Sequence, residues 1–179
     1  LTEFAAWREG KTWKEWSKLG CKYMHEGEAG AYGGYYTQDE LRDLVNYAAE
    51  RGITIVPEIE MPGHSAEVLT AYPELSCTHE PYKQMDFCPG SVATYDFLEN
   101  VLKEVMDIFP SKYIHVGGDE ADKASWPSCP RCQQKMKELG TDKDGLQAHL
   151  IAHFGKFLTE HGRQLVGWDE VIAGNLEKN

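Results

Sequence analysis

The sequence predicts an α/β fold with parallel strands, and two patterns carry this prediction. Segments with the apolar spacing of helices alternate with short apolar runs of strand length along the 179 residues, an order typical of parallel sheets flanked by helices. Each apolar run is also followed directly by acidic side chains, and the functional groups of parallel α/β folds gather at such strand ends. The length corresponds to a single domain. The predicted strands are 53–56, 113–116 and 164–166.

The first part of the chain is predicted to contain one helix. Residues 1–36 are rich in glycine and aromatic side chains, without a clear period, and are interpreted as a long loop. Thr37 and Glu40 have the spacing of a capping box, in which the Thr37 side chain accepts the backbone N–H of Glu40 and the Glu40 side chain accepts the backbone N–H of Thr37. The predicted helix ends at Gly52. Its apolar face comprises Leu41, Leu44, Val45 and Ala48.

The remaining elements follow in regular order. The strand at 53–56 is expected to continue through Ile59, with Pro57 near its C-terminal end because proline cannot donate a ladder hydrogen bond. Helices are predicted at 64–72, 91–109, 130–139 and 144–161, with a loop bearing Cys and Pro reaching residue 90. Pro110 and Gly162 end two of these helices. The tail from Ala173 is interpreted as an exposed end.

Charge and hydrophobicity narrow the classes of partner. The 18 basic and 29 acidic residues give a formal net charge of −11, which disfavours a nucleic-acid partner. No run approaches the roughly 20 apolar residues that a membrane span requires. Leu1 is not an initiator methionine, so we expect the natural N-terminus, and any signal segment, to lie upstream.

The cysteines leave several chemistries open. An odd count of five means that at least one thiol is unpaired within the chain. Cys129 and Cys132 can form a local disulfide, contribute half of a zinc site or remain free thiols, and no second C-x-x-C follows to complete a zinc site. A loop-closing disulfide between two others is a further alternative. The five positions are Cys21, Cys77, Cys88, Cys129 and Cys132.

Acidic residues follow all three predicted strands. Since parallel strands end on one face, we expect these carboxylates to share a cleft with one imidazole and one indole. Such a cleft suits sugar hydrolysis, although the same oxygen ligands suit magnesium or manganese, and an aspartate after a strand is often only a helix cap. Gly117 and Gly118 favour a functional interpretation, because two adjacent glycines exceed what a cap requires. The residues concerned are Glu58, Glu60, His64, Asp119, Glu120, Trp168, Asp169 and Glu170.

The same residues form blocks that closely resemble glycoside hydrolase family 20, the β-N-acetylhexosaminidases. The blocks appear in the family's order and extend along nearly the whole chain. The resemblance implies part of a TIM (β/α)8 barrel over residues 1–179, covering about its third to fifth strands, with the other strands outside the chain. The blocks are Tyr35-Tyr-Thr-Gln-Asp-Glu40, Pro57-Glu-Ile-Glu-Met-Pro-Gly-His-Ser65, Ala71-Tyr-Pro-Glu-Leu75, His115-Val-Gly-Gly-Asp-Glu120 and Gly167-Trp-Asp-Glu170.

The resemblance also implies roles. Members of this family retain configuration by substrate-assisted catalysis, in which the substrate's acetamido oxygen attacks the anomeric carbon and forms an oxazolinium ion. Glu120 matches the general acid and base, and Asp119 matches the residue that orients the acetamido group. Trp168 matches an indole of the acetamido pocket, and His64 matches a supporting histidine. Glu60 and Asp169 are further substrate-binding candidates, although many relatives carry aspartate at the position of Glu60.

The implied partners are glycans or glycoconjugates that end in β-linked N-acetylglucosamine or N-acetylgalactosamine, with no cofactor and no metal. The resemblance leaves the compartment open among secreted, periplasmic and lysosomal. A second interpretation is a catalytically inactive barrel segment that folds only with the rest of its barrel or self-associates through open sheet edges. A third is a metal-dependent barrel enzyme that uses the same carboxylates.

Overall fold

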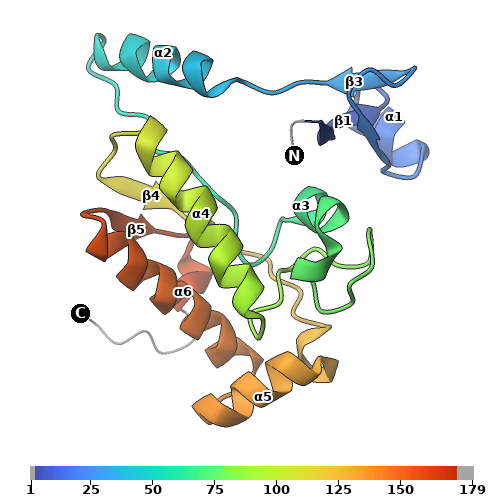
Figure 1. The fold of residues 1–179 in the computed structure, drawn as a ribbon, viewed down its shortest axis with the longest axis vertical. Helices are drawn as coiled ribbons and strands as arrows, with labels where there is room; N and C mark the ends of the chain where they lie inside the picture. Colours follow the sequence, from blue (N-terminus) through green and yellow to red (C-terminus); the bar gives the residue numbers. More distant parts are fainter. Residues whose placement is uncertain (1–2, 173–179) are drawn as a thin grey trace.

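The computed structural model describes residues 3–172, so the predicted tail from Ala173 lies outside the described residues. The main body contains two strands that pair in parallel, β4 (Tyr113–His115) and β5 (Gln164–Val166). Helices α4 (Val92–Ile108) and α6 (Lys143–Glu160) lie side by side along them (Figure 1). The predicted α/β fold with parallel strands is therefore confirmed, and these four elements agree closely with their predicted bounds.

The prediction of a strand at 53–56 is wrong. Residues 53–57 form no ladder, and only Glu58 makes an isolated parallel bridge, to His115. The hydrogen bonds lie further along: Pro57 O accepts from His115 N at 3.0 Å, and Met61 N donates to Val116 O at 3.0 Å. Hydrogen bonding begins at Pro57 because only His115, the last residue of β4, and Val116 after it lie opposite this segment. The extended segment 57–61 is still the third parallel neighbour that the site requires.

Helix α2 (Gln38–Ala49) has the predicted capping box, since Thr37 and Glu40 exchange both bonds. The predicted apolar face is only partly buried, because Val45 and Ala48 are enclosed whereas Leu44 is 45% exposed. The predicted helix at 64–72 is shorter, α3 (Ala66–Ala71), followed by a 3-10 turn at Pro73–Leu75. The predicted polar helix at 130–139 is confirmed as α5 (Pro130–Leu139).

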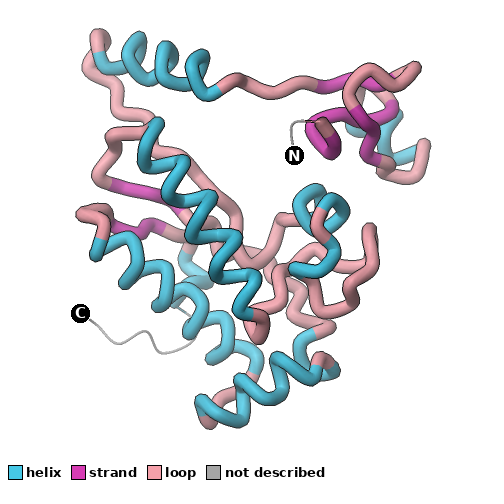
Figure 2. The backbone as a smooth tube through the Cα atoms, in the orientation of Figure 1, coloured by secondary structure: helices cyan, strands magenta, loops and turns pink. Residues whose placement is uncertain are grey.

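The prediction of a loop over residues 1–36 is wrong. These residues form β1 (Phe4–Glu9), α1 (Trp13–Lys18), β2 (Tyr23–His25) and β3 (Ala31–Gly33), with the strands antiparallel in the order β2-β1-β3. A second capping box, Thr12 with Glu15, starts α1. The aromatic side chains that suggested a loop pack on one another instead, and Tyr23 stacks on Tyr82 of the main body at 6.0 Å. Figure 2 shows this small sheet to one side of the helices.

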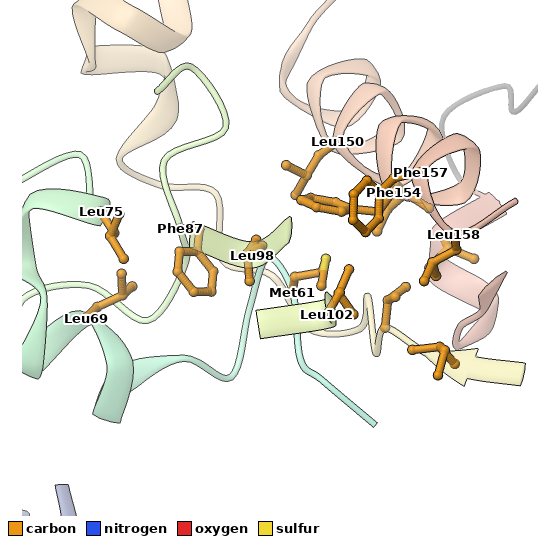
Figure 3. Close-up of a cluster of buried hydrophobic side chains, with 14 residues drawn as sticks. Met61, Leu69, Leu75, Phe87, Leu98, Leu102, Leu150, Phe154, Phe157 and Leu158 are labelled. Carbon is orange, nitrogen blue, oxygen red and sulfur yellow. The ribbon is translucent and has the colours of Figure 1, made fainter. Parts of the chain in front are cut away.

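One continuous core joins the elements of the main body. Met61, from the segment after Glu58, is fully buried between α4 and α6 (Figure 3). Arg163 fastens the same elements at the other end: its guanidinium donates to Met106 O at 3.0 Å, to Phe109 O at 3.1 Å and also to Ser111 O. Labelled side chains of this core include Leu98, Leu102, Leu150, Phe154 and Leu158.

Of the helices that the structure describes, none combines the length and the apolar character needed to cross a bilayer.

Candidate active site

The ends of the three parallel segments place a glutamate, an imidazole and an indole together. His115 Nδ1 lies 2.9 Å from Glu58 Oε1. Trp168 follows β5, and its indole Nε1 donates to the same oxygen at 3.1 Å. The rings of His115 and Trp168 meet edge to face, with their centroids 4.9 Å apart. Glu58 therefore fixes the orientation of an indole that is itself 49% exposed at the surface of the site.

Two glycines let the chain turn tightly at this edge. Gly117 and Gly118 have φ of +66° and +98°, values that side chains with a Cβ rarely adopt. A Cβ on Gly117 would stand 1.8 Å from Glu60 Oε2, and one on Gly118 would stand 2.2 Å from a methyl of Val171. Both positions thus favour glycine for their φ, and Gly118 also for space, since the atoms near Gly117 belong to the end of the flexible Glu60 side chain. The sequence predicts that these two glycines favour a functional site over a helix cap, and their backbone geometry is one that a simple cap would not need.

Asp119 and Glu120, which follow these glycines, converge on one histidine. His64 Nε2 lies 3.5 Å from Asp119 Oδ2 and 3.5 Å from Glu120 Oε2. The Asp119 side chain is 27% exposed and that of Glu120 is 75% exposed, so one carboxylate is sheltered and its neighbour projects outward. His64 and Glu120 both have a positive φ, +50° and +49°. The predicted catalytic pair and the predicted supporting histidine are therefore brought together.

Two carboxylate oxygens of the site are buried without a hydrogen-bond donor among the described residues. They are Asp119 Oδ1 and Glu60 Oε2. Burial raises the pKa of Glu60 to about 7, and the negative charges of Asp119 and Glu58 add to the rise. Glu60 therefore lies within the carboxylate cluster, whereas the Asp169 side chain is exposed and forms no hydrogen bond or ion pair with another described residue.

Glu170, two residues after Trp168, reaches the catalytic pair through the backbone. Its Oε2 accepts the backbone N–H of Glu120 at 2.9 Å. From sequence, Glu58 and Glu170 are expected among the carboxylates of the cleft, but neither they nor His115 is given a specific role. The roles of Glu58 and His115 depend on their contact with each other and on the contact of Glu58 with Trp168, which residue types alone do not specify. The contact of Glu170 had no signal either, because nothing in a sequence indicates an acceptor for one particular N–H fifty residues away.

The segment that follows Glu120 is anchored to the loop before α4. We call residues 119–129 the acid loop. Asp86 accepts the backbone N–H groups of Asp122 at 3.3 Å and of Lys123 at 2.7 Å. Fully buried Trp126 donates its indole N–H to Phe87 O at 3.1 Å. Burial of the Asp86 carboxyl raises its pKa, and its two backbone donors oppose that rise.

The geometry allows two kinds of chemistry. A sheltered carboxylate beside an exposed one suits charge stabilisation paired with proton transfer. One atom from each of His64, Asp119 and Glu120 lies within 4.8 Å of the others, a spacing that also permits a metal ion. A separate hollow of about 370 Å³ lies at the N-terminal sheet, lined by Trp13, Trp16, Tyr23 and Tyr32 among others, and is lined by neither Asp119 nor Glu120.

The chain is similar to several characterised enzymes. A β-hexosaminidase of Porphyromonas gingivalis is 41% identical over 98% of this chain and 24% of its own length, and one of Vibrio furnissii is 42% identical over 80% and 25%. The chain thus spans about a quarter of the relatives that it matches. The crystal structure of a Bacteroides fragilis β-N-acetylhexosaminidase aligns with a TM-score of 0.72 at 43% identity, covering 78% of this chain and 28% of that one.

A Vibrio harveyi exo-β-N-acetylglucosaminidase, solved in complex with N-acetylglucosamine, aligns with a TM-score of 0.77 at 33% identity. The alignment covers 95% of this chain and 27% of that one. The family model described as glycosyl hydrolase family 20, catalytic domain, matches residues 1–179. From sequence blocks, site geometry and this match together, the chain belongs to glycosyl hydrolase family 20.

Proposed function

We propose that the protein containing this chain is a β-N-acetylhexosaminidase that removes terminal β-linked N-acetylglucosamine or N-acetylgalactosamine with retention of configuration. The observation that carries the proposal is the position of His64 Nε2, 3.5 Å from a carboxylate oxygen of both Asp119 and Glu120. It holds two consecutive carboxylates at one point with different exposure, which matches a pair with two different roles.

In the first step, Glu120 donates its proton to the glycosidic oxygen as the bond to the anomeric carbon breaks. The acetamido oxygen of the substrate attacks that carbon, and a cyclic oxazolinium ion forms in place of an ester with the protein. In the second step, Glu120 takes a proton from water, and the resulting hydroxide opens the ring at the anomeric carbon. Two inversions give net retention, and Glu120 ends protonated as it began.

Asp119 is suited to the acetamido group. Its Oδ1 is buried and accepts no hydrogen bond from the described residues, so a substrate N–H supplies the donor that a buried carboxylate oxygen requires. Positive charge grows on the acetamido group as the ring closes, and a nearby carboxylate stabilises that charge most in the transition state. Asp119 therefore contributes more to kcat than to substrate binding.

Trp168 is suited to the floor of the acetamido pocket. Its indole is held in place by Glu58 while half of its surface stays exposed, so it offers a fixed apolar face to an acetyl methyl group. Glu60 and Asp169 remain candidates for substrate contact. We further propose that residues 1–179 form part of a (β/α)8 barrel, about its third to fifth strands, because three consecutive parallel segments end at the site.

Hydrolysis of a chromogenic β-N-acetylglucosaminide by the full-length protein tests the proposal. We expect Glu120→Gln to lower kcat/KM by about 10² to 10⁴, the usual contribution of general acid–base catalysis. Asp119→Asn should lower kcat by about 10² to 10³, the scale of one lost electrostatic contact in a transition state. A β-glucoside without the acetamido group should be a poor substrate for every variant.

Asp122→Asn is the matched control, since this exposed aspartate lies in the same loop and only its backbone N–H is bonded. It should retain wild-type kinetics. Full activity of Glu120→Gln, or equal hydrolysis of the plain glucoside, would refute the mechanism. Activity that depends on added magnesium or manganese would favour a metal-dependent enzyme using His64, Asp119 and Glu120.

A further inference from the structure

Four of the five cysteines meet at one place, beside the acid loop. One sulfur from each of Cys77, Cys88, Cys129 and Cys132 lies within 4.8 Å of the other three. Cys77 and Cys88 lie on the loop before α4, whereas Cys129 and Cys132 lie at the start of α5. We propose that this cluster, which we call the tetracysteine site, binds one structural zinc ion.

The distances between sulfurs fit a metal-centred tetrahedron. Cys77 Sγ is 3.6 Å from Cys132 Sγ, which is in turn 3.6 Å from Cys88 Sγ, and Cys88 Sγ is 3.8 Å from Cys129 Sγ. Thiolates bound about 2.3 Å from zinc at tetrahedral corners lie about 3.8 Å apart. Disulfide sulfurs lie about 2.05 Å apart. Cys132 Sγ and Cys88 Sγ each lie 3.6 to 3.8 Å from two other sulfurs, which a disulfide between one pair does not require and a shared ion does.

The surroundings suit a closed site of protein ligands alone. Cys88 and Cys132 are fully buried, Cys129 is 5% exposed and Cys77 is half-buried. Packed around them are the apolar side chains of Trp126, Leu146 and Met136. Four ligands from the chain fill the tetrahedral shell and exclude water from the ion, as in structural zinc sites. Zinc here would therefore stabilise the fold and take no part in hydrolysis.

Arg131 and the helix terminus offset the charge of four thiolates around a divalent ion. Arg131 lies between two ligands in the sequence, and its guanidinium donates to Ser76 O at 2.9 Å and contacts Ser91 Oγ at 3.4 Å. The positive charge is thus held across both segments that carry ligands. Cys129 and Cys132 also occupy the N-cap and the first turn of the ten-residue α5, where the helix dipole favours negative charge.

The backbone is shaped for this approach. A Cβ on Gly90 would stand 2.4 Å from Arg131 C and 2.5 Å from Cys132 N, so only glycine lets the loop after Cys88 lie directly on the first turn of α5. Thr94 Oγ1 donates to Cys88 O at 2.8 Å and fixes that turn to α4. The two ligand pairs are therefore pressed together by main-chain contacts and not by sulfur chemistry alone.

The position of the tetracysteine site indicates what a bound ion would do. Cys129 ends the acid loop that begins with Asp119 and Glu120, and Cys88 lies two residues after Asp86, which holds the same loop by two backbone bonds. A zinc ion would cross-link the loop before α4 to the far end of the acid loop. We infer that it limits the movement of the segment that carries the catalytic pair.

Metal analysis of the full-length protein, purified without added metal or chelator, is the test. We expect inductively coupled plasma mass spectrometry to find about one zinc per chain. The zinc content should fall at least tenfold in Cys132→Ser and in Cys77→Ser. Cys77→His should retain zinc, because imidazole replaces a thiolate as ligand at this half-buried position. Cys21→Ser is the matched control and should retain it fully, since Cys21 lies outside the cluster.

Thiol counting on the wild-type protein keeps the test independent of variant folding. Alkylation of unfolded, unreduced protein should modify all five cysteines, whereas two disulfides would protect four and overturn the proposal. Absence of zinc, or iron in its place, would overturn it as well. So would zinc that persists in Cys132→Ser and is lost in His64→Ala, because that result would place the ion at the carboxylates. Replacement by cobalt should give the intense visible bands of tetrahedral thiolate coordination.

Discussion

At the scale of single residues, the proposed catalytic pair, Asp119 and Glu120, is held mainly through its backbone. Glu120 has a positive φ of +49° and donates its N–H to Glu170, and the two glycines before it turn with positive φ as well. Backbone strain of this kind persists only when surrounding contacts enforce it. The sequence blocks predict Asp119, Glu120, His64 and Trp168, because their residue types are distinctive. The blocks contain Glu170 but do not predict its role, since that role lies in one contact across fifty residues.

Glu170 is therefore expected to act as a positioning residue. Glu170→Ala removes the acceptor of the Glu120 N–H, and we expect kcat to fall about tenfold with little change in KM, as for a lost charge-assisted hydrogen bond of about 1.5 kcal/mol. Glu170→Gln keeps an acceptor oxygen and should recover most of the rate. Steady-state kinetics on a chromogenic substrate measures both. Equal rates for alanine and wild type would show that the bond has no catalytic consequence.

Glu60 gives stability a dependence on pH. Unfolded, it loses its proton near 4.5, whereas in the fold burial and neighbouring carboxylates hold its pKa at about 7. Between these values the folded state binds more protons, so stability falls as pH rises from 4.5 to 7 and levels above. Glu60→Gln removes this loss. At pH 8 the variant should be more stable by roughly 1 kcal/mol after allowance for solvent screening.

Urea unfolding of the full-length protein at pH 5 and pH 8 measures the effect. The advantage of Glu60→Gln should shrink toward pH 5. Glu74→Gln is the control, since it removes one exposed glutamate from the 3-10 turn after α3 and should leave the pH dependence as it is. An advantage of Glu60→Gln that is the same at both pH values would contradict a proton-linked origin.

At the scale of elements, prediction succeeded where the signal is local. Capping and periodicity placed α2, α4, α5 and α6, because each helix is specified by its own residues. The small N-terminal sheet was missed because β2 and β3 have three residues each, too few for an alternating pattern, and their pairing with β1 depends on contacts distant in sequence. The capping box of Thr12 and Glu15 was a local signal that could have located α1.

The cap of α2 is a measurable local contribution. Thr37→Ala removes the side-chain acceptor of the Glu40 N–H and the hydroxyl that donates to the Glu40 carboxylate, and we expect a loss of about 1 kcal/mol. Thr37→Ser keeps the hydroxyl and should lose only a few tenths. Hydrogen exchange of the amides in the first turn of α2 reports the change directly. Equal protection in the alanine variant and the wild type would show that packing alone holds this terminus.

At the scale of the whole molecule, the α/β order follows from the sequence but the convergence of distant loops does not. The tetracysteine site brings together positions separated by up to 55 residues, and no spacing rule for short metal motifs covers that separation. Its assembly depends on the loop before α4 packing against the first turn of α5 and against the acid loop. The sequence supplied the cysteines, and the path of the chain brought them together.

The exposed start of the first parallel segment bears on how the isolated 179-residue chain behaves. Ile53 is 58% exposed and Val56 is 43% exposed, on a stretch with no ladder partner among the described residues. Exposed apolar side chains on an extended edge favour pairing with other chains. We expect size-exclusion chromatography to show dimers or larger species that diminish in Ile53→Lys with Val56→Lys. A sharp monomer peak for the unmodified chain would contradict this.

Arg163 has a consequence for how β5 finds its place on β4. Displacing a strand by two positions returns every side chain to its original face, so the apolar pattern alone cannot reject an arrangement moved by about 6.6 Å. The guanidinium can reach Met106, Phe109 and Ser111 together in only one arrangement. Arg163, directly before β5, thereby fixes the register of β5 against β4. The register determines which residue follows β5 at the end where the site lies. In the register that Arg163 favours, Trp168 lies within hydrogen-bond distance of Glu58.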